Sequence, residues 1–191
     1  MIPLANRYTV VFDACVLFPN LKRDLLLRFF TADLFRARWS EKIQQEWLQN
    51  AMAKYPENRS ALERTDQLMR RKFESAWVED FEKYLDIVSL PDPDDRHVVA
   101  SAIQCKAQYI VTDNVKDFPV DELAKYELEC GTADRFLAGT FEHYVWQALD
   151  VIREHRAGLK SKPTTTAYIM DLTAKGLPLL AARLKPHQNA I

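Results

Sequence analysis

The sequence predicts an α/β fold, in which helices cover both faces of a parallel sheet, followed by a helical extension. Short apolar, β-prone segments occur within "YTVVFDACVLFP", "LDIVSL", "QYIVT" and "YELEC". Long helical patterns separate the first three of them, which is the arrangement typical of a parallel sheet. After Gly131 the pattern is helical throughout. We therefore expect a three-layer α/β/α sandwich over residues 1–131 and a helical extension over residues 132–191.

The expected elements follow one another along the chain. The continuous apolar run of Val10, Val11 and Phe12 predicts a buried strand, after which the chain turns at Asp13. Ser40 is suited to cap a helix that ends before Pro56. The helices are expected at residues 21–34, 41–55, 59–74 and about 96–106, and the later strands at 85–90, 108–112 and near 126–130.

The composition narrows the chemistry to carboxylates. At 191 residues, with 48% hydrophobic and 28% charged residues, the chain suits an ordinary globular domain and argues against disorder. The three cysteines have no C-x-x-C spacing, so we expect core thiols, and the four histidines form no ligand pair. The four glycines form no phosphate-binding loop. With no apolar run of eighteen residues and no leader pattern, a cytoplasmic protein without a membrane segment is expected.

Acidic residues follow two of the predicted strands. Asp13 ends the first strand, and Asp113 to Asp117 follow the strand at 108–112. Ligands bind outside the carboxyl ends of parallel strands, so both groups belong at the same edge of the sheet. A turn or cap role explains Asp13 as well, and for Asp113 we favour the turn role.

Two helices carry further acids. Glu46 shares a helical face with Ile43, Trp47 and Asn50, the stripe expected to pack on the sheet, although it could equally be a border residue whose head reaches water. Asp95 lies at the start of a helix, where the helix dipole stabilises a carboxylate by roughly 0.3 to 1 kcal/mol. A helix cap is thus a sufficient explanation for Asp95, and Asp94 competes for that position.

If Asp13, Glu46, Asp95 and Asp117 meet, their charges need a partner. Two carboxylates about 4 Å apart repel by roughly 4 kcal/mol at an effective dielectric of 20. Either some of these acids stay protonated or a cation lies among them. Mg²⁺ or Mn²⁺ is the natural cation, because oxygen ligands suit hard divalent ions.

The motifs also carry a family resemblance. "VVFDACVLFP", "SEKIQQEW", "DPDDRHVVASAI" and "YIVTDNVKDFP" together resemble the PIN-domain family, most closely its VapC-like toxin branch, over about residues 8–131. The resemblance implies an α/β/α sandwich and a metal-dependent endoribonuclease. It also implies an RNA substrate, a small antitoxin partner, a possible homodimer and a role in a toxin-antitoxin pair.

The resemblance assigns roles by position. Asp13, Glu46, Asp95 and Asp117 match the four acids, with Asp13, Asp95 and Asp117 as metal ligands and Glu46 binding metal or orienting water. Thr112 and Asn114 match the accompanying polar residues. Asp94 leaves the identity of the third acid open, and the spacing to the following alanines favours Asp95.

Two other classes of function compete with this one. An aspartate-nucleophile phosphatase of the haloacid-dehalogenase kind would need a second acid two residues after Asp13, where Cys15 stands. A non-catalytic PIN-like module that binds RNA or protein is disfavoured by the complete acid set.

Charge is unevenly distributed along the chain. Residues 156–191 carry a net charge of +5, against −6 for the rest. Carboxylates repel phosphate, so lysine and arginine must supply affinity for RNA. We expect the final helices to dock through an apolar face and to present Lys175, Arg183 and Lys185 to RNA.

Overall fold

The computed structural model describes residues 8–191 and places five parallel strands in one sheet, in the order β3-β2-β1-β4-β5. The strands are β1 (Thr9–Phe12), β2 (Arg36–Ser40), β3 (Trp77–Val78), β4 (Tyr109–Val111) and β5 (Glu129–Gly131). β1 is central, paired with β2 on one side and β4 on the other. Residues that follow β1 and β4 are therefore neighbours at the carboxyl edge.

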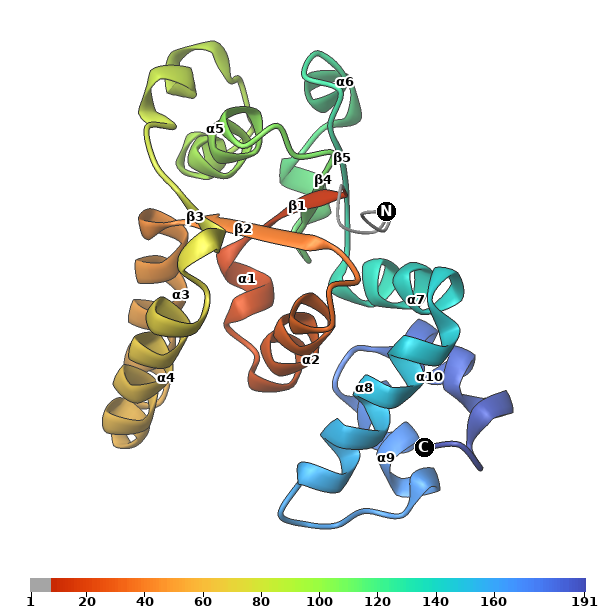
Figure 1. Ribbon diagram of the computed structural model, residues 1–191. Coiled ribbons are helices and arrows are strands. Elements are labelled where there is room, and N and C mark those ends of the chain that lie inside the picture. Colours follow the sequence, from red (N-terminus) through yellow and green to blue (C-terminus); the bar gives the residue numbers. More distant parts are fainter. Residues whose placement is uncertain (1–7) are drawn as a thin grey trace.

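Helices cover both faces of this sheet, as the sequence predicted. In Figure 1, α5 and α6 lie on one face and α1 and α2 on the other, while α3 and α4 pack side by side next to β2 and β3. The α-helices are α1 (Ala14–Leu17), α2 (Asn20–Thr31), α3 (Glu41–Lys54), α4 (Arg59–Lys72), α5 (Arg96–Gln104), α6 (Val120–Ala124), α7 (Ala133–His143), α8 (Val145–Gly158), α9 (Thr165–Ala174) and α10 (Pro178–Leu184). Short 3₁₀ turns are η2 (Pro56–Asn58), η3 (Glu74–Ala76), η4 (Glu82–Ile87), η5 (Pro93–Asp95), η6 (Val115–Asp117) and η7 (Lys185–His187). None of the helices within residues 8–191 has the length and apolar character needed to span a bilayer.

Aromatic side chains fill the core between the sheet and its helices. Phe12 of β1 stacks on Trp39 of β2, with ring centroids 6.1 Å apart, and Trp39 meets Phe73 edge to face. On α3, Ser40 Oγ accepts a hydrogen bond from the Ile43 amide, as the predicted N-cap. The buried face of α3 comprises Ile43, Gln44, Trp47 and Ala51. Asn50, which we expected on this face, is exposed.

The strand expected at 85–90 does not form. This segment contains the end of η4 and then extended chain. Side chains from α6 and from the turn after it form hydrogen bonds with the backbone of this segment. The Ser89 amide donates to Glu122, and Tyr126 Oη donates to the Ile87 carbonyl. Because these side chains pair with the backbone, the apolar run has no need of a neighbouring strand.

Two strands, β2 and β3, were not predicted. In β2, "RARWS", the arginines at positions 36 and 38 interrupt the apolar pattern, although Ala37 and Trp39 are fully buried. β3 consists of Trp77 and Val78 alone and pairs with the end of β2. A two-residue strand is too short to produce an alternating pattern.

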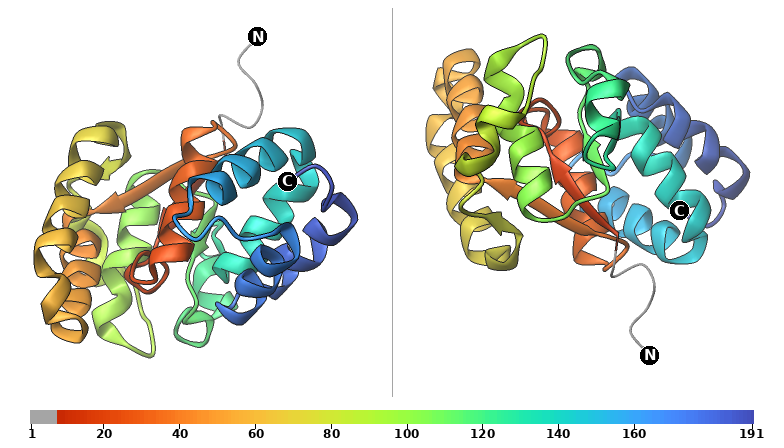
Figure 2. Two further views of the ribbon diagram at one scale, coloured as in Figure 1. Left: turned by 90° about the horizontal axis from the view of Figure 1, so that it is seen from below. Right: turned by 90° about the horizontal axis from the view of Figure 1, so that it is seen from above.

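The helices after residue 131 share the core of the preceding part. Phe136 of α7 packs against Phe35 and Tyr109, with centroids 4.8 and 5.6 Å apart. Figure 2 shows α7 to α10 gathered along one side of the sheet. Residues before and after position 131 therefore contribute to the same hydrophobic core, although the strands end by this position in the sequence and α7 to α10 follow it.

Contacts between polar side chains, including the buried His155, also hold these helices in place. His155 of α8 is buried, and its two ring nitrogens lie 3.3 Å from Asp24 Oδ2 on α2 and 2.7 Å from Tyr168 Oη on α9. Asp134 of α7 accepts hydrogen bonds from the Leu179 and Leu180 amides and so caps α10. The apolar face predicted for the last helices is buried as expected: Tyr168, Ile169, Leu172, Leu177, Leu180 and Leu184.

Candidate active site

Asp13 lies at the carboxyl end of the central strand. Its side chain is only 4% exposed, and it makes no capping hydrogen bond to α1, so the turn-cap explanation has no support in its contacts. Asp13 Oδ2 instead accepts hydrogen bonds from Thr112 Oγ1 at 2.6 Å and Cys15 Sγ at 2.9 Å. A buried carboxylate requires such donors, and these two fix its orientation.

Thr112 and Cys15 form the floor of the site. Thr112 Oγ1 also accepts from the Asn114 amide, so one hydroxyl joins the turn after β4 to Asp13. Burial and the charge of Asp13 raise the pKa of Cys15 to about 12, which keeps the thiol protonated as a donor. Cys15 Sγ in turn accepts from the Asp113 amide. The sequence identified Thr112 but assigned Cys15 only to the core, and its spacing of two residues from Asp13 was the available signal.

Asp95 faces the other acids. Its Oδ2 is buried and has no hydrogen-bond partner among the described residues, and its side chain does not cap α5. Burial, followed by the charges of Asp13, Asp92, Glu46 and Asp117, raises its pKa to about 6. All four predicted acids therefore lie close enough to interact electrostatically. Asp94, by contrast, is exposed, and its charge is not among these causes.

Glu46 reaches the site from α3, and its side chain is 41% exposed. One of its oxygens, Oε2, lies 3.2 Å from Nε2 of His97, which is 1% exposed on the first turn of α5. Glu46 is thus both a border residue and a neighbour of the other acids. No role was predicted for His97, two residues after Asp95, because a lone histidine carries no motif.

The loop after β4 supplies the remaining residues. Asp117 ends η6 and is partly buried, and its charge acts on Asp95. Asp113 lies in this loop, as expected, but the hydrogen bonds of its side chain reach distant elements instead of the turn. It accepts from Lys22 Nζ at 2.5 Å and from the Ala133 amide at 3.2 Å, and so ties α2 and α7 to this loop.

The donor set suits a hard divalent ion. It consists of carboxylate oxygens, including Oδ2 of Asp95, which is buried and has no partner within residues 8–191. Within residues 8–191, no three Asp, Glu, His or Cys side chains already stand in a metal-binding arrangement. The acids interact electrostatically at the carboxyl edge of the sheet, but their oxygens are not arranged as a complete set of metal ligands.

The three cationic residues expected to bind RNA lie on the surface of the C-terminal helices. Lys175 pairs with Asp171 at 2.9 Å, Arg183 pairs with Glu142, and Lys185 is exposed. The turn after α9 approaches the acid edge, because a Cβ on Gly176 would lie 3.4 Å from Lys22 Nζ. Lys22 in turn binds Asp113, the residue after Thr112. Lys175 therefore immediately precedes the residue at which the turn approaches the carboxyl edge of the sheet.

Comparison with known proteins decides the family. A model of the PIN domain matches residues 9–116, more than half of the chain. The chain belongs to the PIN domain family. The match includes Asp13, Glu46 and Asp95 and ends one residue before Asp117.

One curated relative of this PIN-domain chain is the protein named "Putative ribonuclease VapC50" from Mycobacterium tuberculosis (strain ATCC 25618 / H37Rv). The two are 32% identical over 91 residues, which is 48% of this chain and 54% of the relative. The chain thus matches about half the length of that relative. No solved structure gave a significant match.

Proposed function

We propose that the protein is an endoribonuclease that depends on Mg²⁺ or Mn²⁺ and hydrolyses RNA phosphodiester bonds. The observation that carries this proposal is the environment of Asp95. Its Oδ2 is buried without a hydrogen-bond partner among the described residues, and burial first, then the charges of Asp13, Asp92, Glu46 and Asp117, raise its pKa to about 6. A fold that gathers like charges in this way is strained until a cation enters.

Each residue has a distinct proposed role. Asp13, Asp95 and Asp117 would hold the metal, which when bound lowers the pKa of a water molecule and neutralises charge on the phosphate. Thr112 and Cys15 orient Asp13, and Asn114 shapes the turn below it. Glu46, exposed at the rim, would bind metal or orient the attacking water.

The cellular role proposed for this nuclease follows its relatives. The PIN domain and the name of the mycobacterial relative, a ribonuclease, support an action on RNA. The resemblance of the motifs to VapC-like toxins supports the role of toxin in a toxin-antitoxin pair, acting in the cytoplasm. A small antitoxin and a homodimer are the partners that this role implies.

Purified protein incubated with a mixed RNA pool tests the activity. Cleavage is expected with Mg²⁺ or Mn²⁺ and should stop with EDTA. Asp13→Asn should abolish it, because the neutral side chain keeps its shape but loses the charge that holds the metal. Asp94→Asn is the matched control and should cleave like the wild type, since Asp94 is exposed and its charge is not among the causes that raise the pKa of Asp95. Full activity in well-folded Asp13→Asn would refute the site, and RNA binding without cleavage would favour a non-catalytic binding module.

A further inference from the structure

A pocket lies at the opposite edge of the sheet from the acids. Tyr8 immediately precedes β1, Phe35 immediately precedes β2 and Tyr109 is the first residue of β4, so all three mark the amino ends of parallel strands. The second half of α7 closes this pocket, which has a volume of about 420 Å³. It is therefore separate from the site formed by Asp13 and Asp95.

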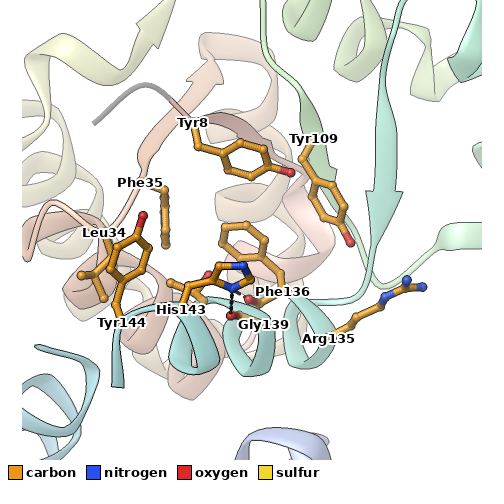
Figure 3. Close-up of a pocket in the computed structure, with 10 residues that line it drawn as sticks. Tyr8, Leu34, Phe35, Tyr109, Arg135, Phe136, Gly139, His143 and Tyr144 are labelled. Carbon is orange, nitrogen blue, oxygen red and sulfur yellow. Dashed lines mark hydrogen bonds between the residues drawn. The ribbon is translucent and has the colours of Figure 1, made fainter. Parts of the chain in front are cut away.

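Aromatic rings form most of its wall. Figure 3 shows Tyr8, Phe35, Phe136, His143 and Tyr144 arranged around a common space, with Tyr109 beside them. A Cβ on residue 131 would lie 2.1 Å from Tyr109 Oη, so Gly131 is what allows this phenol to stand where it does. Ring faces of this kind hold a planar aromatic group by stacking.

The polar groups of the pocket are available to a ligand. His143 Nδ1 lies 2.8 Å from the Gly139 carbonyl, which only accepts, so Nδ1 carries the proton and Nε2 is left as an acceptor. Burial raises the pKa of Tyr109 to about 12, and its hydroxyl has no hydrogen-bond partner in the described part of the chain. Both side chains offer the directional contacts that orient a ring.

Arg135 adds a positive charge to this pocket. It has no ion-pair partner within residues 8–191, and none of the described lining residues is acidic. Burial and then the charge of Glu129 raise the pKa of Tyr8, whereas the charge of Arg135 opposes the burial that raises the pKa of Tyr109. Arg135 therefore makes its end of the pocket the favourable place for an anionic group. Arginine is well matched to phosphate because of its several parallel donors.

We propose that this pocket binds a nucleoside monophosphate unit, with the base among the aromatic rings and the phosphate at Arg135. The volume lies within the range of roughly 300 to 1,000 Å³ that small-molecule sites occupy. The unit can come from a free nucleotide or from an RNA strand. An RNA strand cut at the acid edge would have to pass the length of the sheet, which is about 13 Å along a four-residue strand such as β1.

Gly139 provides a sharp test. It lies in α7 and lines the pocket, and a Cβ there would meet nothing within 4 Å. Gly139→Leu would fill the pocket, whereas Gly139→Ala adds only one methyl group. Both replacements favour the helix over glycine, so both variants should fold. Arg135→Gln removes the charge from an exposed position.

Calorimetric titrations of the whole protein in EDTA, with AMP, GMP, CMP and UMP, measure binding without any cleavage. At least one nucleotide should bind saturably, and inorganic phosphate or the matching nucleoside should bind at least about tenfold more weakly. Gly139→Leu should abolish binding and Gly139→Ala should retain it. Arg135→Gln should weaken binding by about 10- to 100-fold, the loss expected for a charge-assisted hydrogen bond.

A short single-stranded oligoribonucleotide, titrated in the same way, separates the two sources. If it binds more tightly than the mononucleotide and Gly139→Leu removes that gain, the ligand is part of an RNA strand. If it binds no more tightly, the ligand is a free nucleotide. Failure of every nucleotide to saturate, or wild-type binding by both Gly139→Leu and Arg135→Gln, would overturn the proposal. Because these titrations contain no divalent ion, their outcome is independent of the nuclease activity.

Discussion

His97 Nε2 lies 3.2 Å from Glu46 Oε2 and joins the helix that follows Asp95 to the helix that carries Glu46. The imidazole is buried and fixed on α5, while the carboxylate is partly exposed and on a flexible stem. The contact therefore restrains the more mobile partner. Glu46 is thereby held to α5, the helix that begins immediately after Asp95.

Replacing His97 with Leu should slow RNA cleavage without unfolding the protein. Loss of a side chain that orients an active-site group costs about 10- to 100-fold in activity. The effect should fall on kcat rather than KM, because His97 is buried and does not touch RNA. Stability should hold, since Leu removes the Nδ1 atom that is buried without a partner among the described residues. Steady-state kinetics and thermal melts measure both effects.

His97→Gln is the rescue variant, because its amide nitrogen can again reach Glu46. It should recover part of the lost kcat. Equal kcat values for the Leu variant and the wild type would show that Glu46 needs no support from α5.

Thr112→Val should destabilise the fold and reduce cleavage together. The hydroxyl donates to Asp13 and accepts from the Asn114 amide, and valine can do neither. Leaving buried polar groups unpaired costs about 1–3 kcal/mol. Urea denaturation measures this loss. Thr112→Ser keeps the hydroxyl and should retain most of the stability and activity, and an equal loss in both variants would mean that the methyl group matters instead.

Neutralising Asp95 should stabilise the metal-free protein in a pH-dependent way. Its pKa rises from 3.8 to about 6 on folding, so the folded state favours the protonated form. Below about pH 4, Asp95 is protonated in both the folded and the unfolded state, and its ionisation costs the wild type no stability. As the pH rises from about 4 to 6, the free energy of unfolding of the wild type falls, and above that range the loss is complete. Thermal melts in EDTA should therefore place Asp95→Asn above the wild type at pH 7 and level with it near pH 4.

Mg²⁺ should reverse this order of stabilities at pH 7, because the wild type retains the charge that binds the ion. Asp94→Asn is the control and should melt like the wild type throughout. Equal stabilisation of wild type and Asp95→Asn by Mg²⁺ would contradict the role of Asp95 as a metal ligand.

Regular elements with clear caps and periodicity could be predicted from the sequence. α3 begins after Ser40 as expected, and β1 and β4 carry continuous apolar runs. The failures have tertiary causes. The segment at 85–90 pairs with Glu122 and Tyr126 instead of a strand, and β2 forms with Ala37 and Trp39 buried although two arginines interrupt its pattern. Both outcomes depend on contacts with residues that are far apart in the sequence and close in space.

The site was predictable where topology dictates proximity. Asp13 and Thr112 follow adjacent parallel strands, and a hydrogen bond of 2.6 Å joins them. The sequence could not tell that Asp94 is exposed while Oδ2 of Asp95 is buried, because adjacent residues differ only in the direction in which their side chains point. Cys15 and His97 each contact a single atom of one acid, and apart from the two-residue spacing between Asp13 and Cys15 the sequence carries no signal of these contacts.

Replacing Lys175, Arg183 and Lys185 with Ala should weaken RNA binding. Residues 156–191 carry a charge of +5, and the ion pairs of Lys175 and Arg183 are exposed, so phosphates can compete for both cations. For single-stranded RNA the salt dependence, log K against log salt, should lose about 0.7 per phosphate contact, or up to about 2 in all. Turnover at saturating RNA should stay near that of the wild type. Among the single variants, Lys175→Ala should have the largest effect, since its turn approaches Lys22 at the acid edge.

Substitutions of the acidic partners of these cations test the same prediction from the other side of each ion pair. Asp171→Asn and Glu142→Gln remove the acids that pair with Lys175 and Arg183 but leave both cations in place. If the C-terminal helices contact RNA, this double variant should bind more tightly at low salt, because the cations no longer have competing partners. Binding titrations over a range of salt concentrations measure both variants. An unchanged slope in the alanine variant, together with unchanged affinity in the double variant, would mean that these cations do not contact RNA and that the helices serve the core or a protein partner.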